Sequence, residues 1–101
     1  KRDLILVSGF NVYPEEVERV LDQHPDVEGC AVVGQPHPYT GETVKAFVKP
    51  RAGAEVLEDE INAFCRRLLA RYKCPTVLEV VDHLPTTATG KVRRVDLRDV
   101  P

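Results

Sequence analysis

Apolar residues recur at strand spacing in some segments and at helix spacing in others, so the chain predicts a mixture of strands and helices. The first thirteen residues show the strand pattern. Residues 4–7 form a short apolar run, Ser8-Gly9 supplies turn chemistry, and residues 10–13 alternate again. Two short strands joined by a two-residue turn predict a β-hairpin at the start of the chain.

A helix is expected from Pro14 onward, because proline has the fixed φ and the missing amide that suit a first helical turn. Val17, Val20 and Leu21 then fall on one face, and the segment 24–26 ends the helix. Three later apolar runs predict strands at residues 27–33, 44–48 and 77–81, with a Gly- and Pro-rich loop over residues 34–41.

The longest periodic segment lies between the last two of these strands. Its apolar face runs from Leu57 to Tyr72, with acidic residues leading and basic residues trailing, as the helix dipole favours. Cys74-Pro75 is expected to end this helix. Residues 92–100 predict a short terminal helix. The predicted fold class is α+β, with a small three-stranded sheet packed with helices and an N-terminal β-hairpin.

Length and charge limit the function classes. The chain has 101 residues, with 14 basic against 16 acidic side chains and a net charge of −2. One domain with a modest core is expected, and a large enclosed active-site cavity is not. The near-neutral charge argues against nucleic-acid binding, and no apolar run reaches the roughly 18 residues of a transmembrane helix. A cytoplasmic location is the expectation, and the start without Met suggests a piece of a longer protein.

Cysteines and histidines give no pattern typical of a metal site. Cys30, Cys65 and Cys74 are odd in number and lack CxxC spacing, so reduced thiols are expected, with Cys30 and Cys65 in the core. His37 has no second histidine or carboxylate at ligand spacing. His24 and His83 are expected to cap elements or lie on the surface. No metal site and no complete active site are predicted.

The segment 84–94 carries the clearest candidate chemistry. Three threonines and Gly90 precede Lys91, which Arg93 and Arg94 follow. An exposed, mobile loop of this kind can deliver an ammonium to a phosphate or a carboxylate, with glycine relieving the backbone beside it. A solvated turn without function is the alternative. Ser8-Gly9 has the same two interpretations, since glycine permits close approach of a ligand but also suits a hairpin turn.

Taken together, these segments resemble the C-terminal domain of the adenylate-forming enzymes, the superfamily of acyl-coenzyme A synthetases, luciferases and peptide-synthetase adenylation domains. The resemblance covers essentially the whole chain, in order and with family spacing. Residues 11–14, Asn-Val-Tyr-Pro, favour acyl- or aryl-coenzyme A ligases. The matching segments are Arg2 to Ile5, Ser8 to Glu18, His24-Pro25, Ala31 to Gly34, Gly41-Glu42, Ala46 to Val48, Tyr72 to Pro75 and Leu84 to Lys91.

The resemblance implies a reaction in two halves. A carboxylate attacks the α-phosphate of Mg-ATP to give an acyl adenylate, and the thiol of coenzyme A then displaces AMP. By position, Lys91 would be the adenylation lysine, and Ser8 and Gly9 would lie beside the pantetheine arm of coenzyme A after the domain rotates. Arg2 falls at the hinge, where the family often has Asp or Lys. Asn11 replaces an arginine of some acetyl-coenzyme A synthetases, so its phosphate contact is not carried over.

The resemblance also implies what lies outside the chain. Residues 1–101 would be a single C-terminal lid domain, and the ATP- and acyl-binding N-terminal domain would be its partner. ATP, Mg²⁺, coenzyme A and a carboxylic acid, with a fatty acid favoured, would be needed by the full enzyme. The isolated chain is expected to fold but not to catalyse. Two alternatives remain open: an adenylation domain that loads a carrier protein, and a stand-alone α+β interaction module.

Overall fold

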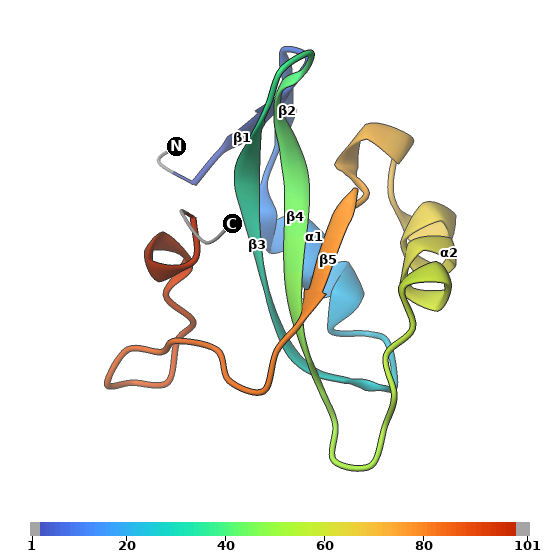
Figure 1. Cartoon of the computed structure of the whole chain (residues 1–101), viewed down its shortest axis with the longest axis vertical. Helices are drawn as coiled ribbons and strands as arrows, with labels where there is room; N and C mark the ends of the chain where they lie inside the picture. Colours follow the sequence, from blue (N-terminus) through green and yellow to red (C-terminus); the bar gives the residue numbers. More distant parts are fainter. Residues whose placement is uncertain (1–2, 99–101) are drawn as a thin grey trace.

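The computed structural model describes residues 3–98 (Figure 1). Arg2, the predicted hinge residue, lies outside this range. The described part is built from short strands, two α-helices and two 3-10 helices. In chain order they are β1 (Ile5–Val7), β2 (Phe10–Val12), α1 (Pro14–Leu21), β3 (Val27–His37), β4 (Gly41–Pro50), α2 (Glu58–Leu68), η1 (Arg71–Lys73), β5 (Val77–Val80) and η2 (Arg94–Asp96).

All five described strands belong to one sheet with β4 at its centre. β3 pairs antiparallel with β4 along its length. On the other edge of β4, β1 pairs at Gly41 and β5 runs parallel from Lys45 to Val48. β2 pairs with β1 at the outer edge. The α+β class is confirmed, and the hairpin predicted beside a three-stranded sheet is joined to it.

The long β3–β4 hairpin corrects the predicted loop over residues 34–41. Residues 34–37 continue β3 and pair with residues 41–44, so only residues 38–40 remain between the strands. Pro36 misled the prediction, because proline removes a ladder hydrogen bond. β3 pairs only with β4 among the described strands, and proline is tolerated on such an edge strand.

The second helix is shorter than its apolar pattern predicts. α2 ends at Leu68, and Leu69 is extended (φ −129°, ψ 150°). Tyr72 therefore lies in η1, where its ring stacks against Phe10 of β2 with centroids 5.0 Å apart. The predicted helix over residues 92–100 is also wrong in its described part, which holds only the single turn of η2; residues 99 and 100 lie outside the described range.

Both faces of the sheet are covered. Side chains of α1 and α2 pack on one face in a core that includes Val17, Leu21, Ile61 and Cys65. The segment after β5 crosses the opposite face, where Leu97 packs on Ala31, Val33 and Phe47 (Figure 1). Double coverage explains why β3 and β4 read as nearly continuous apolar runs instead of alternating ones.

Cys30 and Cys65 are free and buried, as expected, and Cys74 is free and buried as well. Burial raises the pKa of the Cys65 thiol to about 11. The pKa of Cys30 is raised further, first by burial and then by the nearby Asp22 carboxylate. Thiols that stay protonated in this way are poor nucleophiles and act as small apolar side chains.

Candidate functional site

Lys91 lies at the end of a small ordered turn. Thr86 and Val92 form a bridge, the amide of Thr87 donates to the carbonyl of Lys91 at 2.7 Å, and the amide of Lys91 donates to Thr87 Oγ1 at 3.1 Å. Gly90 has φ +88°, which glycine adopts without strain. The predicted exposure of this loop is confirmed, and these hydrogen bonds give the segment a defined shape.

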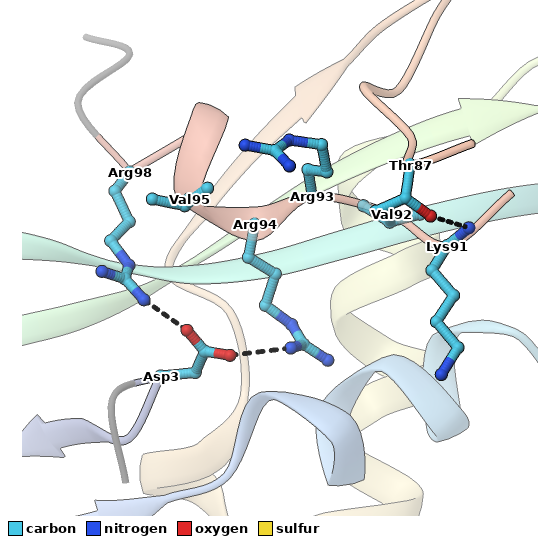
Figure 2. A pocket seen from close by; sticks show the side chains of 8 residues that line it. All are labelled: Asp3, Thr87, Lys91, Val92, Arg93, Arg94, Val95 and Arg98. Carbon is cyan, nitrogen blue, oxygen red and sulfur yellow. Dashed lines mark hydrogen bonds and ion pairs between the residues drawn. The ribbon is translucent and has the colours of Figure 1, made fainter. Parts of the chain in front are cut away.

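The Lys91 ammonium extends away from the turn (Figure 2). The residue is exposed, and no carboxylate of the described residues lies within 4.0 Å of its Nζ. Its side chain points toward α1 and lines a shallow groove with Glu15, Glu18 and Asp22 of that helix. The ammonium is therefore free of ion pairs within this part of the chain, and it stands on the acidic side of α1.

Arg94 attaches the Lys91 segment to the rest of the domain. Its Nε and Nη2 donate to the two carboxylate oxygens of Glu18 at 2.8 and 2.6 Å, and its Nη1 donates to Asp3 at 3.0 Å. The hydrogen bonds from Arg94 to Glu18 raise the pKa of the guanidinium. Figure 2 shows Arg94 and Arg98 converging on Asp3 from the C-terminal segment.

The charge state of Asp3 is set by these two arginines. Partial burial works against ionisation of Asp3. Hydrogen bonds and charges from Arg98 and Arg94 outweigh burial, so the pKa of Asp3 lies below its ordinary value of 3.8. The carboxylate therefore stays ionised and joins the first described residue, Asp3, to the last one, Arg98.

Ser8 and Gly9 form the tip of the β1–β2 hairpin, as predicted. Both have positive φ, 51° and 83°, which is the conformation of a type I′ turn. The Ser8 amide donates to the carbonyl of Thr40 at 2.8 Å, which ties this tip to the β3–β4 turn. A Cβ added to Gly9 would meet no heavy atom within 4 Å, so the space beside Gly9 is open to solvent.

The structure keeps the two predicted site segments apart. In Figure 1 the β1–β2 tip lies at one end of the long axis, and the orange-red turn that carries Lys91 lies toward the other end, beyond the sheet. Neither segment borders an enclosed cavity. The two segments cannot act together on one small ligand bound to this domain, so each would have to contribute to a site completed by another surface.

Two of the three histidines accept backbone hydrogen bonds in turns, and His83 is exposed. His37 Nδ1 accepts the amides of Tyr39 and Thr40, and His24 Nδ1 accepts the amide of Asp26. His24, Asp26 and Glu60 bring potential ligand atoms within 4.8 Å of one another. The hydrogen bond from the Asp26 amide uses the lone pair on Nδ1, so the proton of a neutral His24 ring lies on Nε2. That ring then has no free lone pair for a metal ion.

Comparison with known proteins agrees with the resemblance. Residues 16–91 match the family model of the AMP-binding enzyme C-terminal domain. The chain belongs to this family. The match ends at Lys91, so it includes the exposed ammonium and excludes Ser8-Gly9.

The relatives of this C-terminal domain are far longer than the chain. A long-chain-fatty-acid–CoA ligase from Escherichia coli O157:H7 is 48% identical over 99 residues, covering 98% of the chain and 18% of the relative. A feruloyl-CoA synthase from Amycolatopsis is 45% identical over 97 residues, covering 96% and 20%. The chain thus spans about a fifth of the length of these relatives.

A solved structure supports the fold. o-Succinylbenzoate CoA synthetase from Bacillus subtilis, in complex with an acyl-adenylate intermediate, superposes with a TM-score of 0.92 at 36% identity, covering 100% of the chain and 20% of that protein. The described helices of this C-terminal domain include none that is long and apolar enough to cross a membrane.

Sequence reasoning placed Lys91 in an exposed segment and Ser8-Gly9 at a hairpin tip, but it missed the partners of Arg94. Glu18 and Arg94 are 76 residues apart, and Asp3 and Arg94 are 91 apart. No local pattern links residues at such separations. The available signal was an arginine of unassigned role three positions after Lys91, together with an acidic residue near the middle of α1.

Proposed function

We propose that the chain is the C-terminal lid domain of an AMP-forming acyl-coenzyme A synthetase. The full enzyme would activate a carboxylic acid, with a fatty acid favoured, using ATP, and would then form the coenzyme A thioester. The observation that carries the proposal is the exposed Lys91 ammonium, free of ion pairs among residues 3–98 and presented by an ordered turn in a domain of the AMP-binding enzyme family.

Lys91 would act in the first half-reaction. A carboxylate attacking an α-phosphate brings two anions together, and negative charge grows on the phosphoryl oxygens in the transition state. A positioned ammonium that lies between them offsets this repulsion. A compact charge on a flexible stem suits delivery into a site built by another domain, whereas the planar guanidinium of arginine has a different reach and shape.

Ser8 and Gly9 would act in the second half-reaction. Coenzyme A presents its thiol at the end of a narrow pantetheine arm, and a glycine at a hairpin tip leaves room for that arm. The open space beside Gly9 supports this role. Because Ser8-Gly9 and Lys91 lie far apart on the domain, the proposal requires the lid to rotate between the two half-reactions, with Arg2 at the hinge.

The remaining parts of the reaction would be supplied from outside these residues. The N-terminal domain of the same enzyme would hold ATP, which binds as its Mg²⁺ complex, and the acyl group. The enzyme would work in the cytoplasm, where ATP and coenzyme A are available. The isolated chain is expected to be inactive, because it offers one charge and one hairpin but no nucleotide pocket.

The test is Lys91→Ala in the full-length enzyme. Pyrophosphate exchange into ATP should fall by about 10²-fold or more, the scale of losing one preorganised charge. Thioester formation from a supplied acyl adenylate should be unchanged. Lys49→Ala is the matched control, since it removes an ammonium that pairs with Glu28 on another part of the surface. Equal loss in both half-reactions, or in neither, would show that Lys91 has another role.

A carrier protein is the second candidate acceptor. The chain favours coenzyme A through residues 11–14 and through its similarity to proteins named as CoA ligases and synthases. Comparing the rates at which the full enzyme acylates coenzyme A and a holo-carrier protein decides between the two. A fatty acid and a feruloyl-like aryl acid should be assayed in parallel, because one similar protein is named a long-chain-fatty-acid–CoA ligase and another a feruloyl-CoA synthase.

A further inference from the structure

Arg94 links the Lys91 turn to the carboxylates of Glu18 and Asp3. Only two residues separate Arg94 from Lys91, and an extended chain spans at most about 3.6 Å per residue. Fixing Arg94 therefore keeps the Lys91 backbone within about 11 Å of the Arg94 backbone. The amide of Arg93 also donates to the carbonyl of Pro85 at 2.8 Å, which closes the base of the turn.

Glu18 is a firm anchor for Arg94. Its carboxylate accepts two parallel hydrogen bonds from the guanidinium and a third from the backbone amide of Val32 at 2.9 Å. The side chains of Arg94 and Glu18 are only 18% and 15% exposed. Two parallel bonds to a carboxylate restrict orientation as well as distance, which a lysine ammonium cannot reproduce.

The guanidinium of Arg94 is held by carboxylates. In Figure 2 the side chains of Arg94 and Lys91 both extend toward α1, and the Arg94 guanidinium bonds to Asp3. The guanidinium is occupied by Glu18 and Asp3, so it has little capacity left for a phosphate. Its effect on a reaction would therefore pass through the position of Lys91.

We infer that Arg94 is a positioning residue: its bidentate pair with Glu18 holds the Lys91 turn in the orientation needed for adenylation. This inference rests on the proposed role of Lys91. A shift of about 1 Å in a reacting group can cost on the order of 10²-fold in rate, so a released turn should slow the first half-reaction without affecting the hairpin that serves the second.

The experiment uses Arg94→Gln, Arg94→Lys and Glu18→Gln in the full-length enzyme. Each should lower kcat for pyrophosphate exchange by about 10-fold or more, with KM for ATP and for the acid within about threefold. Thioester formation from supplied adenylate should stay within about twofold. Arg93→Gln is the matched control, because the partner of Arg93 within residues 3–98 is the neighbouring Asp96, and it should cost much less.

A double-mutant cycle tests whether Arg94 acts through Lys91. Once Lys91 is alanine, no ammonium remains to be positioned, so Arg94→Gln should cost less than about twofold in that background. An undiminished cost there, a loss in the thioester step equal to that in adenylation, or full activity of Arg94→Gln would each overturn the inference. If Lys91→Ala alone left adenylation intact, the proposed function would fail as well.

Discussion

Two independent features of the structure favour glycine at position 9. Its φ of +83° disfavours residues with a Cβ, and the space beside it is empty within the domain. The positive φ is required by the turn itself, whereas the open space matters only for a ligand or a surface that approaches the turn. Ser8 tolerates its own positive φ at the preceding position, so the hairpin does not require two glycines. A substitution that respects the backbone but fills the space separates the two reasons.

Gly9→Asn is that substitution, because asparagine adopts positive φ more readily than other residues with a side chain. The variant should lose about 1 kcal/mol of stability or less. In the full-length enzyme, thioester formation should fall about 10-fold while pyrophosphate exchange stays unchanged. Unfolding curves and the two half-reaction assays measure these effects. An unchanged thioester rate would exclude a role for Gly9 beside the pantetheine arm.

Gly34 provides a second test at the residue scale. A Cβ added there would lie 2.6 Å from Glu42 Oε2, while Glu42 Oε1 accepts the amide of Leu6 at 2.9 Å. Gly34→Ala should therefore displace the carboxylate and cost about 1 kcal/mol more than in a Glu42→Ala background, where no clash arises. Urea unfolding of the four chains measures the difference, and equal effects in both backgrounds would contradict it.

At the scale of elements, periodicity located the five strands and both α-helices among residues 3–98, but it missed η1 and most of the element ends. α1 begins at Pro14, as predicted from the properties of proline. α2 stops early because Tyr72 and Lys73 are used elsewhere, in the contact with Phe10 and in an ion pair with Glu16 at 3.0 Å. Such contacts join distant segments, so they leave no local signal. Gly34 and Pro36 predicted a loop for the same reason: their strand pairing depends on β4.

The first turn and the last turn of α2 should respond differently to truncation. Ile61 is fully buried, whereas Leu68 at the end of the same helix is 51% exposed. Ile61→Ala should destabilise the domain by about 2–5 kcal/mol through lost burial and a residual cavity. Leu68→Ala should cost less than about 1 kcal/mol. Thermal and urea unfolding check both values, and similar losses would show that α2 packs differently.

At the scale of the whole molecule, Asp3 links the two ends of the described chain. Arg94 and Arg98 lower its pKa below 3.8, so the folded state binds this proton more weakly than the unfolded state. The resulting stabilisation is fully present above the unfolded pKa and disappears as the pH falls through 3.8 and then through the lower folded value.

Asp3→Asn should therefore be less stable than the parent chain at neutral pH, and the difference should shrink as the pH falls below about 3.8. Added salt should reduce the difference as well. Denaturant midpoints measured across this range provide the check. Asp82→Asn, which removes an exposed carboxylate, is the control. Its denaturant midpoint should change with pH in parallel with that of the parent chain. A pH-independent deficit in Asp3→Asn would mean that its ion pairs contribute nothing.

The candidate site was predictable only where single residues and their neighbours in the chain define it. The Thr-Gly-Lys pattern pointed to Lys91, and turn chemistry pointed to Ser8-Gly9, because each depends on neighbours in the chain. Their separation on the domain and the attachment of Lys91 through Arg94, Glu18 and Asp3 depend on the whole fold. Charged residues far apart in the sequence have many possible partners, and only the packed structure selects among them.

The pair between Glu18 and Arg94 also bears on solubility. β3 is the outer strand beside β4, and an outer strand with free backbone amides can template pairing with another chain. The backbone amide of Val32 donates to the Glu18 carboxylate, so this amide is not free. The guanidinium of Arg94 places a positive charge beside the same edge. Intermolecular strand addition at this point would have to displace a satisfied carboxylate, so the same contact that orients the Lys91 turn protects the domain against edge-to-edge aggregation.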